Sequence, residues 1–268
     1  MPPRSRRLLQ RLGCALGLAL TAMTAGAHES AAQEITAVYS AFWAGLPAAQ
    51  IRLKLGDNGP AYHDEIKIVT EGLPRLFTRF RATAFAEGRR GTDRIAQPSH
   101  YLAVFDLRKR HDRRISMQFI NRTGATVAER GADDTSGKPP LAESFRRNIV
   151  DPLSAFERIR AALRAATPGG SFSVPVYDGA RRFDVVGKVL PKNNTNDRVL
   201  HAELILRPIA GFKGATSEDG DPDDAPRKVQ LTVTDDDRKV PLSIRVPVFF
   251  MPLVVQFQRL CAAPERCA

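Results

Sequence analysis

The sequence predicts a mainly β protein: a single curled antiparallel sheet, forming an open or spiral β-barrel, with one main α-helix packed on it. Three observations indicate this fold. Apolar and polar residues alternate with a period of two in many short segments, turn residues separate these segments, and one stretch alone has helical apolar spacing. Short turns without intervening helices favour antiparallel connections. Because a flat sheet of this size would leave a large apolar face uncovered, we expect it to curl.

The strands follow from the alternation. Ile51, Leu53 and Leu55 alternate with Arg52 and Lys54, so one face of this strand is buried and the other is solvated. About a dozen strands are expected on this basis. They cover residues 35–42, 49–55, 62–70, 82–87, 101–107, 115–119, 126–130, 172–177, 182–190, 200–207, 229–233, 240–246 and 253–260.

The main helix begins after Asp151, which is a good N-cap, with Pro152 in the first turn. It is expected to end before Pro168-Gly169-Gly170, and to lay its apolar stripe on the dry face of the sheet or to plug one mouth of the barrel. A shorter helical turn is expected at 73–80. The apolar stripe is Leu153, Phe156, Ile159, Leu163 and Ala166, and the polar side carries Glu157, Arg158, Arg160 and Arg164.

The first 27 residues have the pattern of a signal peptide: a basic start, the apolar segment 12–25, and the small-residue site Ala25-Gly26-Ala27. Cleavage after Ala27 would leave residues 28–268 as a single antiparallel β domain in the periplasm. Two alternatives stay open, a lipid attached to Cys14 and twin-arginine export directed by 5–9. Cleavage removes four arginines and no acidic residue, so the formal charge falls from +11 to +7.

The remaining two cysteines, Cys261 and Cys267, are expected to form a disulfide, because the exported chain enters an oxidising compartment. Closing so short a loop stabilises the chain by roughly 2–3 kcal/mol. A metal site at these cysteines lacks further ligands, since the nearest histidine in sequence is His201. No cofactor or metal is expected elsewhere either. The acidic loop 218–224 departs from the EF-hand template and is better explained as solvated.

Export makes nucleic acid an improbable partner and places anionic lipid headgroups and acidic wall polymers nearby. A basic cluster at one expected hairpin end is the candidate contact for such anionic surfaces; protection of a strand end against aggregation is the other interpretation. The mature chain is expected to contain no transmembrane segment. The cluster consists of Arg108, Lys109, Arg110, Arg113 and Arg114.

Catalytic motifs are absent from the sequence, which contains neither G-x-S-x-G nor H-E-x-x-H. His63, His100, His111 and His201 share no spacing rule, so no catalytic residue is assigned. Aromatic side chains either line a cavity for an apolar ligand or fill the core, and core packing is the default interpretation. The aromatic side chains in question are Phe42, Trp43, Phe77, Phe80, Phe85, Phe105, Phe119, Phe156, Phe249, Phe250 and Phe257.

Several stretches together resemble a domain family of unknown function, number three thousand one hundred and eight, in exported proteins of Gram-negative bacteria. The residues that carry the resemblance are Tyr39, Phe42 and Gly45; Glu71-Gly72; Gly88, Pro98 and Tyr101; Asp151-Pro152-Leu153-Ser154-Ala155; Tyr177-Asp178-Gly179 with Arg182 and Phe183; and Val240-Pro241. The resemblance implies a secreted antiparallel β protein without an established activity. At the level of fold it is similar to periplasmic spiral or open β-barrels, including lipoprotein carriers and envelope-integrity factors.

From these observations we expect a periplasmic, non-enzymatic envelope factor that binds a lipid-like ligand or an envelope component. A protein–protein scaffold of the envelope machinery is the alternative, and a hydrolase is a third. A dry cavity larger than packing alone leaves would favour the lipid-binding protein, whereas a scaffold requires only an exposed patch.

Overall fold

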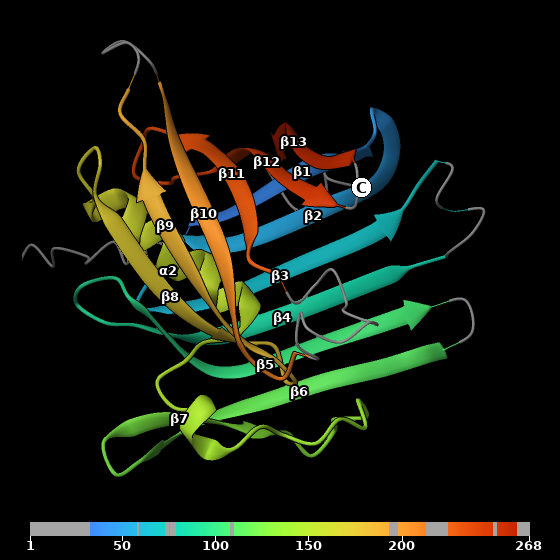
Figure 1. The fold of residues 1–268 in the computed structure, drawn as a ribbon, viewed down its shortest axis with the longest axis vertical. Helices are drawn as coiled ribbons and strands as arrows, with labels where there is room; N and C mark the ends of the chain where they lie inside the picture. Colours follow the sequence, from blue (N-terminus) through green and yellow to red (C-terminus); the bar gives the residue numbers. More distant parts are fainter. Residues whose placement is uncertain are drawn as a thin grey trace, which may run out of the picture. The chain divides into compact units, whose positions relative to one another are not determined.

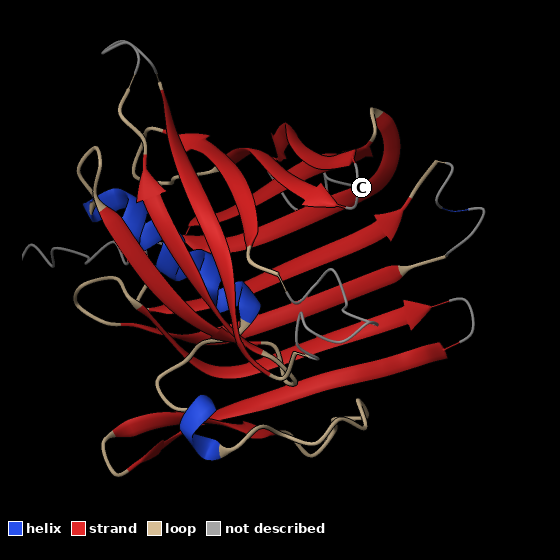
Figure 2. Cartoon of the chain, in the orientation of Figure 1, coloured by secondary structure: helices blue, strands red, loops and turns tan. Residues whose placement is uncertain are grey.

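The structure, a computed structural model, describes residues 33–57, 59–72, 75, 79–107, 110–192, 198–212, 225–248 and 251–261. Within them, thirteen strands form one antiparallel sheet, accompanied by one α-helix and one turn of 3₁₀-helix (Figures 1 and 2). The mainly β fold with one main helix is therefore confirmed. The predicted signal peptide, the acidic loop and most of the predicted turn at 73–80 lie outside the described residues.

The elements follow one another along the chain in this order: β1 (Gln33–Trp43), β2 (Leu46–Asp57), β3 (Ala61–Thr70), β4 (Arg81–Arg90), β5 (Ala96–Leu107), β6 (Arg110–Arg122), β7 (Ala125–Arg130), η1 (Glu143–Phe145), α2 (Pro152–Ala165), β8 (Ser171–Tyr177), β9 (Arg182–Val189), β10 (Val199–Ala210), β11 (Arg227–Thr234), β12 (Pro241–Val248) and β13 (Met251–Cys261).

The strand order is β7-β6-β5-β4-β3-β2-β1-β13-β12-β11-β10-β9-β8, so the first and last strands pair in the middle of the sheet. Their register runs from Thr36 opposite Cys261 to Trp43 opposite Leu253. Every other pair joins strands that follow one another in sequence, as expected for short antiparallel connections. The pairing of β1 with β13 is the long-range contact that unites two meanders.

The two edge strands are joined by a short segment, residues 146–150. On the β7 side, the Ala128 amide donates to the Arg146 carbonyl at 3.0 Å and the Asn148 amide donates to the Thr126 carbonyl at 2.7 Å. On the β8 side, the Val150 amide donates to the Pro175 carbonyl at 3.0 Å. Backbone groups at a free strand edge need partners, and this segment supplies them. The sheet is thereby nearly closed and barrel-like.

Helix α2 begins as predicted. The Asp151 carboxylate accepts hydrogen bonds from the amides of Leu153 at 2.9 Å and Ser154 at 2.8 Å. Its apolar residues divide between two cores: Leu153 packs with side chains of β1–β6, whereas Ile159 and Leu163 pack with β8–β11. The helix therefore lies inside the curl of the sheet, against both halves.

Because of this position, two residues of the predicted polar side of the helix, Glu157 and Arg160, are buried and not solvated. The side chains of Glu157 and Arg160 are each only 1% exposed, because the sheet surrounds the helix on more than one face. Arg160 donates to a Glu157 oxygen, and Arg90 of β4 reaches the other oxygen of the same carboxylate at 2.8 Å. Buried charges of this kind require partners, and here Arg90 of the sheet adds to the pair within the helix.

Small residues on β4 make room for the helix. Ala82 and Ala86 are buried, and Gly88 lies so close to neighbouring atoms that an added Cβ would approach the Gln97 carbonyl oxygen to 2.2 Å and the Tyr62 hydroxyl to 2.8 Å. A larger side chain at this position would collide with the backbone of β5 and with the Tyr62 hydroxyl. This explains why glycine stands opposite Pro98 in the β4–β5 pair.

Candidate binding site

Three adjoining hollows lie where helix α2 begins, and Pro152 lines all of them. Their volumes are about 340, 220 and 210 Å³. They open toward the rim of the barrel that is formed by the C-terminal ends of β1, β3, β5, β8, β10 and β12, which we call the mouth rim. The rim formed by the N-terminal ends of these strands is the far rim. We call the three hollows together the mouth cavity. The largest of them reaches the range of roughly 300–1,000 Å³ that is usual for small-molecule sites.

The innermost hollow is apolar. Ile51, Ile66, Phe156 and Val255 point into it, yet they are only partly buried although they face the interior. These side chains therefore do not fill the space between the sheet and the helix. An apolar cavity of about 150 Å³ is known to stay dry and to bind benzene. The full lining is Tyr39, Ile51, Leu53, Ile66, Pro152, Leu153, Phe156, Pro241, Ile244 and Val255.

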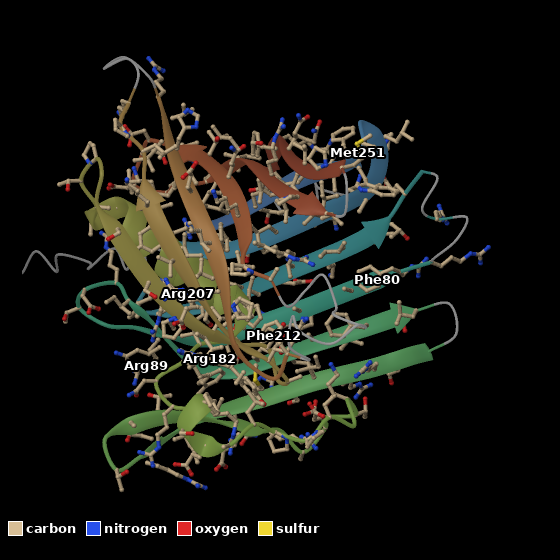
Figure 3. All side chains as sticks on the ribbon, viewed as in Figure 1. Phe80, Arg89, Arg182, Arg207, Phe212 and Met251 are labelled. Atoms are coloured by element: carbon tan, nitrogen blue, oxygen red, sulfur yellow. The ribbon has the colours of Figure 1, made fainter. Side chains whose placement is uncertain are left out.

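The largest hollow combines aromatic and basic side chains. Phe80 and Phe105 stack with ring centroids 6.3 Å apart, and Arg113 enters from β6. The Arg113 Nη2 donates to the Ser136 carbonyl at 3.0 Å, so its position is set by the loop after β7. Lys138 of the same loop also lines this hollow. Figure 3 shows Phe80 and Met251 on the same side of the sheet, toward its mouth rim.

The third hollow adds the turn between β8 and β9. The Arg181 guanidinium lies 5.5 Å from the centroid of the Phe212 ring, and its Nε donates to Asp178 at 2.9 Å. In the described part of the chain, this and the largest hollow are lined by four basic side chains and one carboxylate: Arg113, Lys138, Arg181 and Arg227, with Asp178. Among the described residues that line these two hollows, basic side chains are therefore in excess, and such an excess attracts anions.

The Tyr177-Asp178-Gly179 turn is built to hold this arrangement. The Asp178 carboxylate accepts from the amides of Ala180 at 3.0 Å and Arg181 at 2.7 Å, and the Tyr177 hydroxyl donates to the Gly179 carbonyl at 2.9 Å. Gly179 has φ +93°, and a Cβ there would lie 2.5 Å from the Ile115 Cγ2. Only glycine fits at this point of the cavity wall.

Burial raises the pKa of hydroxyl and carboxyl groups around the cavity. Burial raises the pKa of Tyr62 and Tyr101, so both remain phenols at neutral pH. Burial also raises the pKa of Asp151 to about 6, against the lowering effect of its hydrogen bonds from Ser154 and Leu153.

The predicted basic cluster is only partly visible. Arg108 and Lys109 lie outside the described residues, and the side chain of Arg110 is not described. Arg113 points into the mouth cavity, whereas Arg114 points away and pairs with Asp112 at 2.9 Å. The alternation of β6 separates these two neighbours onto opposite faces. Contact with an anionic surface through the cluster stays a prediction.

The other basic residues of the mouth were missed because they come from separate parts of the chain. Lys138 lies in the loop after β7, Arg181 in the β8–β9 turn and Arg227 at the start of β11, and nothing in their spacing links them. The one available signal was Arg181, which stands two residues after the Tyr177-Asp178-Gly179 turn. Of the aromatic candidates, Phe80, Phe105 and Phe156 line the cavity, and Trp43 is exposed. Phe77, Phe249 and Phe250 lie outside the described residues.

Two histidines that share no spacing rule are brought together by strand register. His63 of β3 and His100 of β5 flank Glu87 of β4 on the outer face, with Nδ1 to carboxylate distances of 3.8 and 3.9 Å. In the described part of the chain, no three His, Cys, Asp or Glu side chains are grouped so that they could hold a metal ion. Cys261 is the last residue of β13, and Cys267 lies outside the described residues, so the disulfide stays a prediction.

A model of a protein family of unknown function, DUF3108, matches residues 38–257, which includes every described strand at least in part. The chain belongs to the DUF3108 family. The sequence resemblance is therefore confirmed, and its Asp-Pro-Leu-Ser-Ala and Tyr-Asp-Gly motifs are the helix cap and the cavity turn described above. No curated protein matches the sequence of this DUF3108 member at a significant level.

Among solved structures, this DUF3108 protein is similar to a β-barrel-like protein of the DUF1849 family from Brucella abortus. The TM-score is 0.54 at 8% sequence identity, and the match covers 85% of this chain and 95% of the other. Such low identity shows a shared fold alone. In the described part of the chain, no helix is both long and apolar enough to cross a membrane.

Proposed function

We propose that this protein binds a lipid-like anionic amphiphile in the mouth cavity and acts, after export, as a non-enzymatic factor of the cell envelope. One observation carries the proposal: two hollows that share Pro152, one apolar, around Ile66 and Val255, and one partly basic, around Arg113 and Arg181. A ligand with an apolar chain and an acidic head matches this order of surfaces.

The apolar end supplies the binding energy in this proposal. Each methylene group transferred from water into such a hollow contributes about 0.8 kcal/mol. The basic entrance supplies orientation, because charged groups near solvent add little affinity but strongly disfavour the reversed pose.

A second candidate function, a scaffold for envelope proteins, is favoured by a different observation. Of the eight exposed large apolar side chains in the described part, five lie at strand ends of the mouth rim: Trp43, Leu46, Val69, Ile209 and Met251. An exposed apolar rim of this kind suits contact with another surface. It does not require the cavity, so the two functions are separable by experiment.

Native mass spectrometry of the exported protein after gentle purification tests the ligand directly. A co-purified lipid supports the lipid-binding proposal, and a captured protein partner without lipid supports the scaffold. Turnover of an envelope substrate, lost on changing one carboxylate or histidine, would establish an enzyme instead.

A titration with a dansyl-labelled fatty acid sharpens the test. Ile66→Trp places a large ring in the innermost hollow, and we expect it to weaken binding of the probe by about tenfold or more. Lys67→Trp, on the outer face of the same strand, is the matched control and should leave binding unchanged. Equal affinity in both variants would overturn the assignment of the site, provided that both keep the thermal stability of the parent.

A further inference from the structure

One part of the mouth rim carries exposed apolar side chains on four strands that lie side by side in the order β3-β2-β1-β13. Each of these side chains is between 38% and 51% exposed. Single exposed apolar side chains are ordinary, whereas a group on neighbouring strands marks a contact with another surface. We call the group the rim patch, and its members are Trp43, Leu46, Val69 and Met251.

Backbone hydrogen bonds fix the tips that carry the rim patch to one another. The β1–β2 turn has two residues of positive φ, Ala44 at 51° and Gly45 at 80°, as in a two-residue hairpin loop. The Ala44 amide donates to the Pro252 carbonyl of the β12–β13 hairpin at 3.4 Å. On the other side, the Glu71 amide after β3 donates to the Ala48 carbonyl of β2 at 2.9 Å. The rim patch is therefore one surface and not a set of independent tips.

Two of the three connections around the rim patch carry no charge. Residues 43–47 of the β1–β2 hairpin and residues 246–255 of the β12–β13 hairpin include no acidic or basic side chain. Tryptophan, leucine and methionine side chains without charged neighbours match the boundary between the acyl chains and the headgroups of a bilayer.

Basic residues follow the rim patch on its β4 side. The two mouth-rim connections there, residues 70–81 and 106–113, together contain seven arginine or lysine residues and three acidic ones. Arg75, Arg79 and Arg81 are exposed. The acidic residues 218–224 belong to the β10–β11 connection, which the strand order places on the other side of the patch. The rim is thus apolar and basic from β6 to β13, and this side complements an anionic lipid surface.

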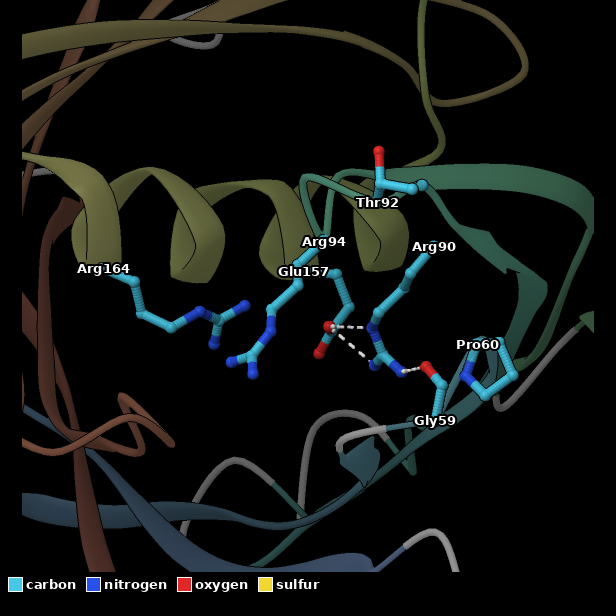
Figure 4. A pocket seen from close by; sticks show the side chains of 8 residues that line it. Gly59, Pro60, Arg90, Thr92, Arg94, Glu157 and Arg164 are labelled. Atoms are coloured by element: carbon cyan, nitrogen blue, oxygen red, sulfur yellow. Dashed lines mark hydrogen bonds and ion pairs between the residues drawn. The ribbon is translucent and has the colours of Figure 1, made fainter.

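The far rim presents a different surface. Its pocket of about 390 Å³ is lined by the side chains of Arg90, Arg94 and Arg164 around Glu157 (Figure 4). Ile95, in the β4–β5 turn of this rim, is 40% exposed and stands beside the charged group. A contact through exposed apolar side chains is therefore expected at the mouth rim.

We propose that the protein docks on an anionic phospholipid bilayer through this part of the mouth rim. The rim patch enters the boundary of the acyl chains, and the arginines of the β3–β4 connection lie among the headgroup phosphates. The mouth cavity opens at the same rim, so docking brings its entrance to the lipid surface. This deepens the proposed function by naming the surface from which the amphiphile enters, although the docking itself needs no ligand in the cavity.

Fluorescence of Trp43 tests the docking directly, because this residue of the rim patch is the only tryptophan in the sequence. The exported protein is titrated with vesicles of phosphatidylcholine alone and with vesicles that also contain phosphatidylglycerol. With phosphatidylglycerol we expect the Trp43 emission to shift to shorter wavelength and to be quenched by phospholipids brominated in the acyl chain. The affinity should be lower for phosphatidylcholine alone, and should fall as salt is raised.

Leu46→Glu and Met251→Glu each place a charge in the rim patch, so each should weaken vesicle binding by about tenfold or more. Ile95→Glu is the matched control, because it makes the same kind of change at a comparably exposed apolar side chain of the far rim. It should keep the affinity of the parent. All three positions are exposed, and thermal melts should show that all three variants keep the fold.

The double variant Arg79→Gln/Arg81→Gln tests the basic side. It should weaken binding to phosphatidylglycerol vesicles by about tenfold and leave binding to phosphatidylcholine vesicles unchanged. Arg89→Gln is the control, since Arg89 is exposed at the other end of β4, toward the far rim (Figure 3).

The proposal is overturned if neither kind of vesicle shifts the Trp43 emission, or if Leu46→Glu and Ile95→Glu bind vesicles equally well. A captured protein that needs Leu46, without vesicle binding, would assign the rim patch to a protein partner instead. A titration with dansyl fatty acid separates this proposal from the proposed function. Leu46→Glu should lose vesicles and keep the fatty acid, whereas a parent that binds vesicles but no fatty acid would refute the proposed function alone.

Discussion

The mouth and far ends of the barrel use the same elements to bury opposite kinds of side chain. On β3, Ile66 faces the apolar hollow near the mouth, whereas Asp64 is fully buried toward the far rim. Helix α2 changes in the same direction, from Leu153 and Phe156 at its start to Glu157 and Arg160 further on. The interior therefore has an unfilled apolar end and a densely bonded charged end.

This difference teaches how the fold separates stability from binding. At the far end, the Glu157 carboxylate is held by Arg90 of β4 and by Arg160 of its own helix, so the buried charges are paired with one another. At the mouth, apolar side chains that face inward lack neighbours, which leaves room for a ligand. The largest effects of mutation on stability are thus expected at the far end, and the largest effects on amphiphile binding at the mouth.

Glu157→Ala should have the largest effect. It leaves Arg90 and Arg160 buried without their shared carboxylate, and breaking a buried pair of this kind costs about 3–5 kcal/mol. Urea unfolding followed by circular dichroism measures the loss. Glu87→Ala, at an exposed outward position of β4, is the control and should change stability by less than about 0.5 kcal/mol. A small loss in Glu157→Ala would show that the far end is not held by its charges.

Asp64 gives the charged end a pH dependence. Burial, with the neighbouring Glu157 carboxylate, raises the pKa of Asp64 to about 8, while an unfolded aspartate titrates near pH 4. Between these values the folded state binds more protons, so the free energy of unfolding falls as the pH rises.

Asp64→Asn keeps an acceptor for the Gly56 amide and removes this proton. We expect the variant to match the parent below about pH 4 and to be more stable by on the order of 2 kcal/mol above pH 8. Denaturant melts across this range provide the test, with Glu203→Gln on the outer face of β10 as control. Parallel curves for parent and Asp64→Asn would mean that Asp64 is ionised in the fold.

Substituting one glycine of positive φ in a turn at each rim compares how well the two rims tolerate a side chain. Gly179→Ala at the mouth faces both its φ of +93° and a contact with Ile115, whereas Gly124→Ala at the far rim has φ +80° and nothing within 4 Å of the new Cβ. We expect Gly124→Ala to cost about 1 kcal/mol and Gly179→Ala at least about 1 kcal/mol more. Thermal melts measure the difference, and equal costs would show that the cavity wall yields at Ile115.

The basic entrance should give the smallest effect. Arg113→Gln and Lys138→Gln are expected to weaken the binding of a dansyl fatty acid by about three- to tenfold at low salt. The affinity for its uncharged methyl ester should stay the same. Lys188→Gln, exposed on β9, is the control. If acid and ester lose affinity equally, the basic residues shape the cavity and do not recognise charge.

Much of the fold was predictable because it depends on local spacing. The alternation of Ile51 with Arg52 identified strand and inward face, and Asp151 with Pro152 identified the start of the helix. The mistaken element was the polar side of α2. Glu157 and Arg160 have the sequence pattern of a solvated surface, and their partners Arg90 and the Arg238 carbonyl are remote in sequence.

The sequence by itself determined the strand faces, the turns, the helix cap and the family, since each rests on residues a few positions apart. Tertiary structure alone decided that β1 pairs with β13, that residues 146–150 bridge the two edges, and that Arg113, Arg181 and Arg227 meet around one cavity. A cavity is the difference between the volume that a curled sheet encloses and the volume that its inward side chains fill. Neither quantity is a property of any one segment, so both appear only when the sheet closes.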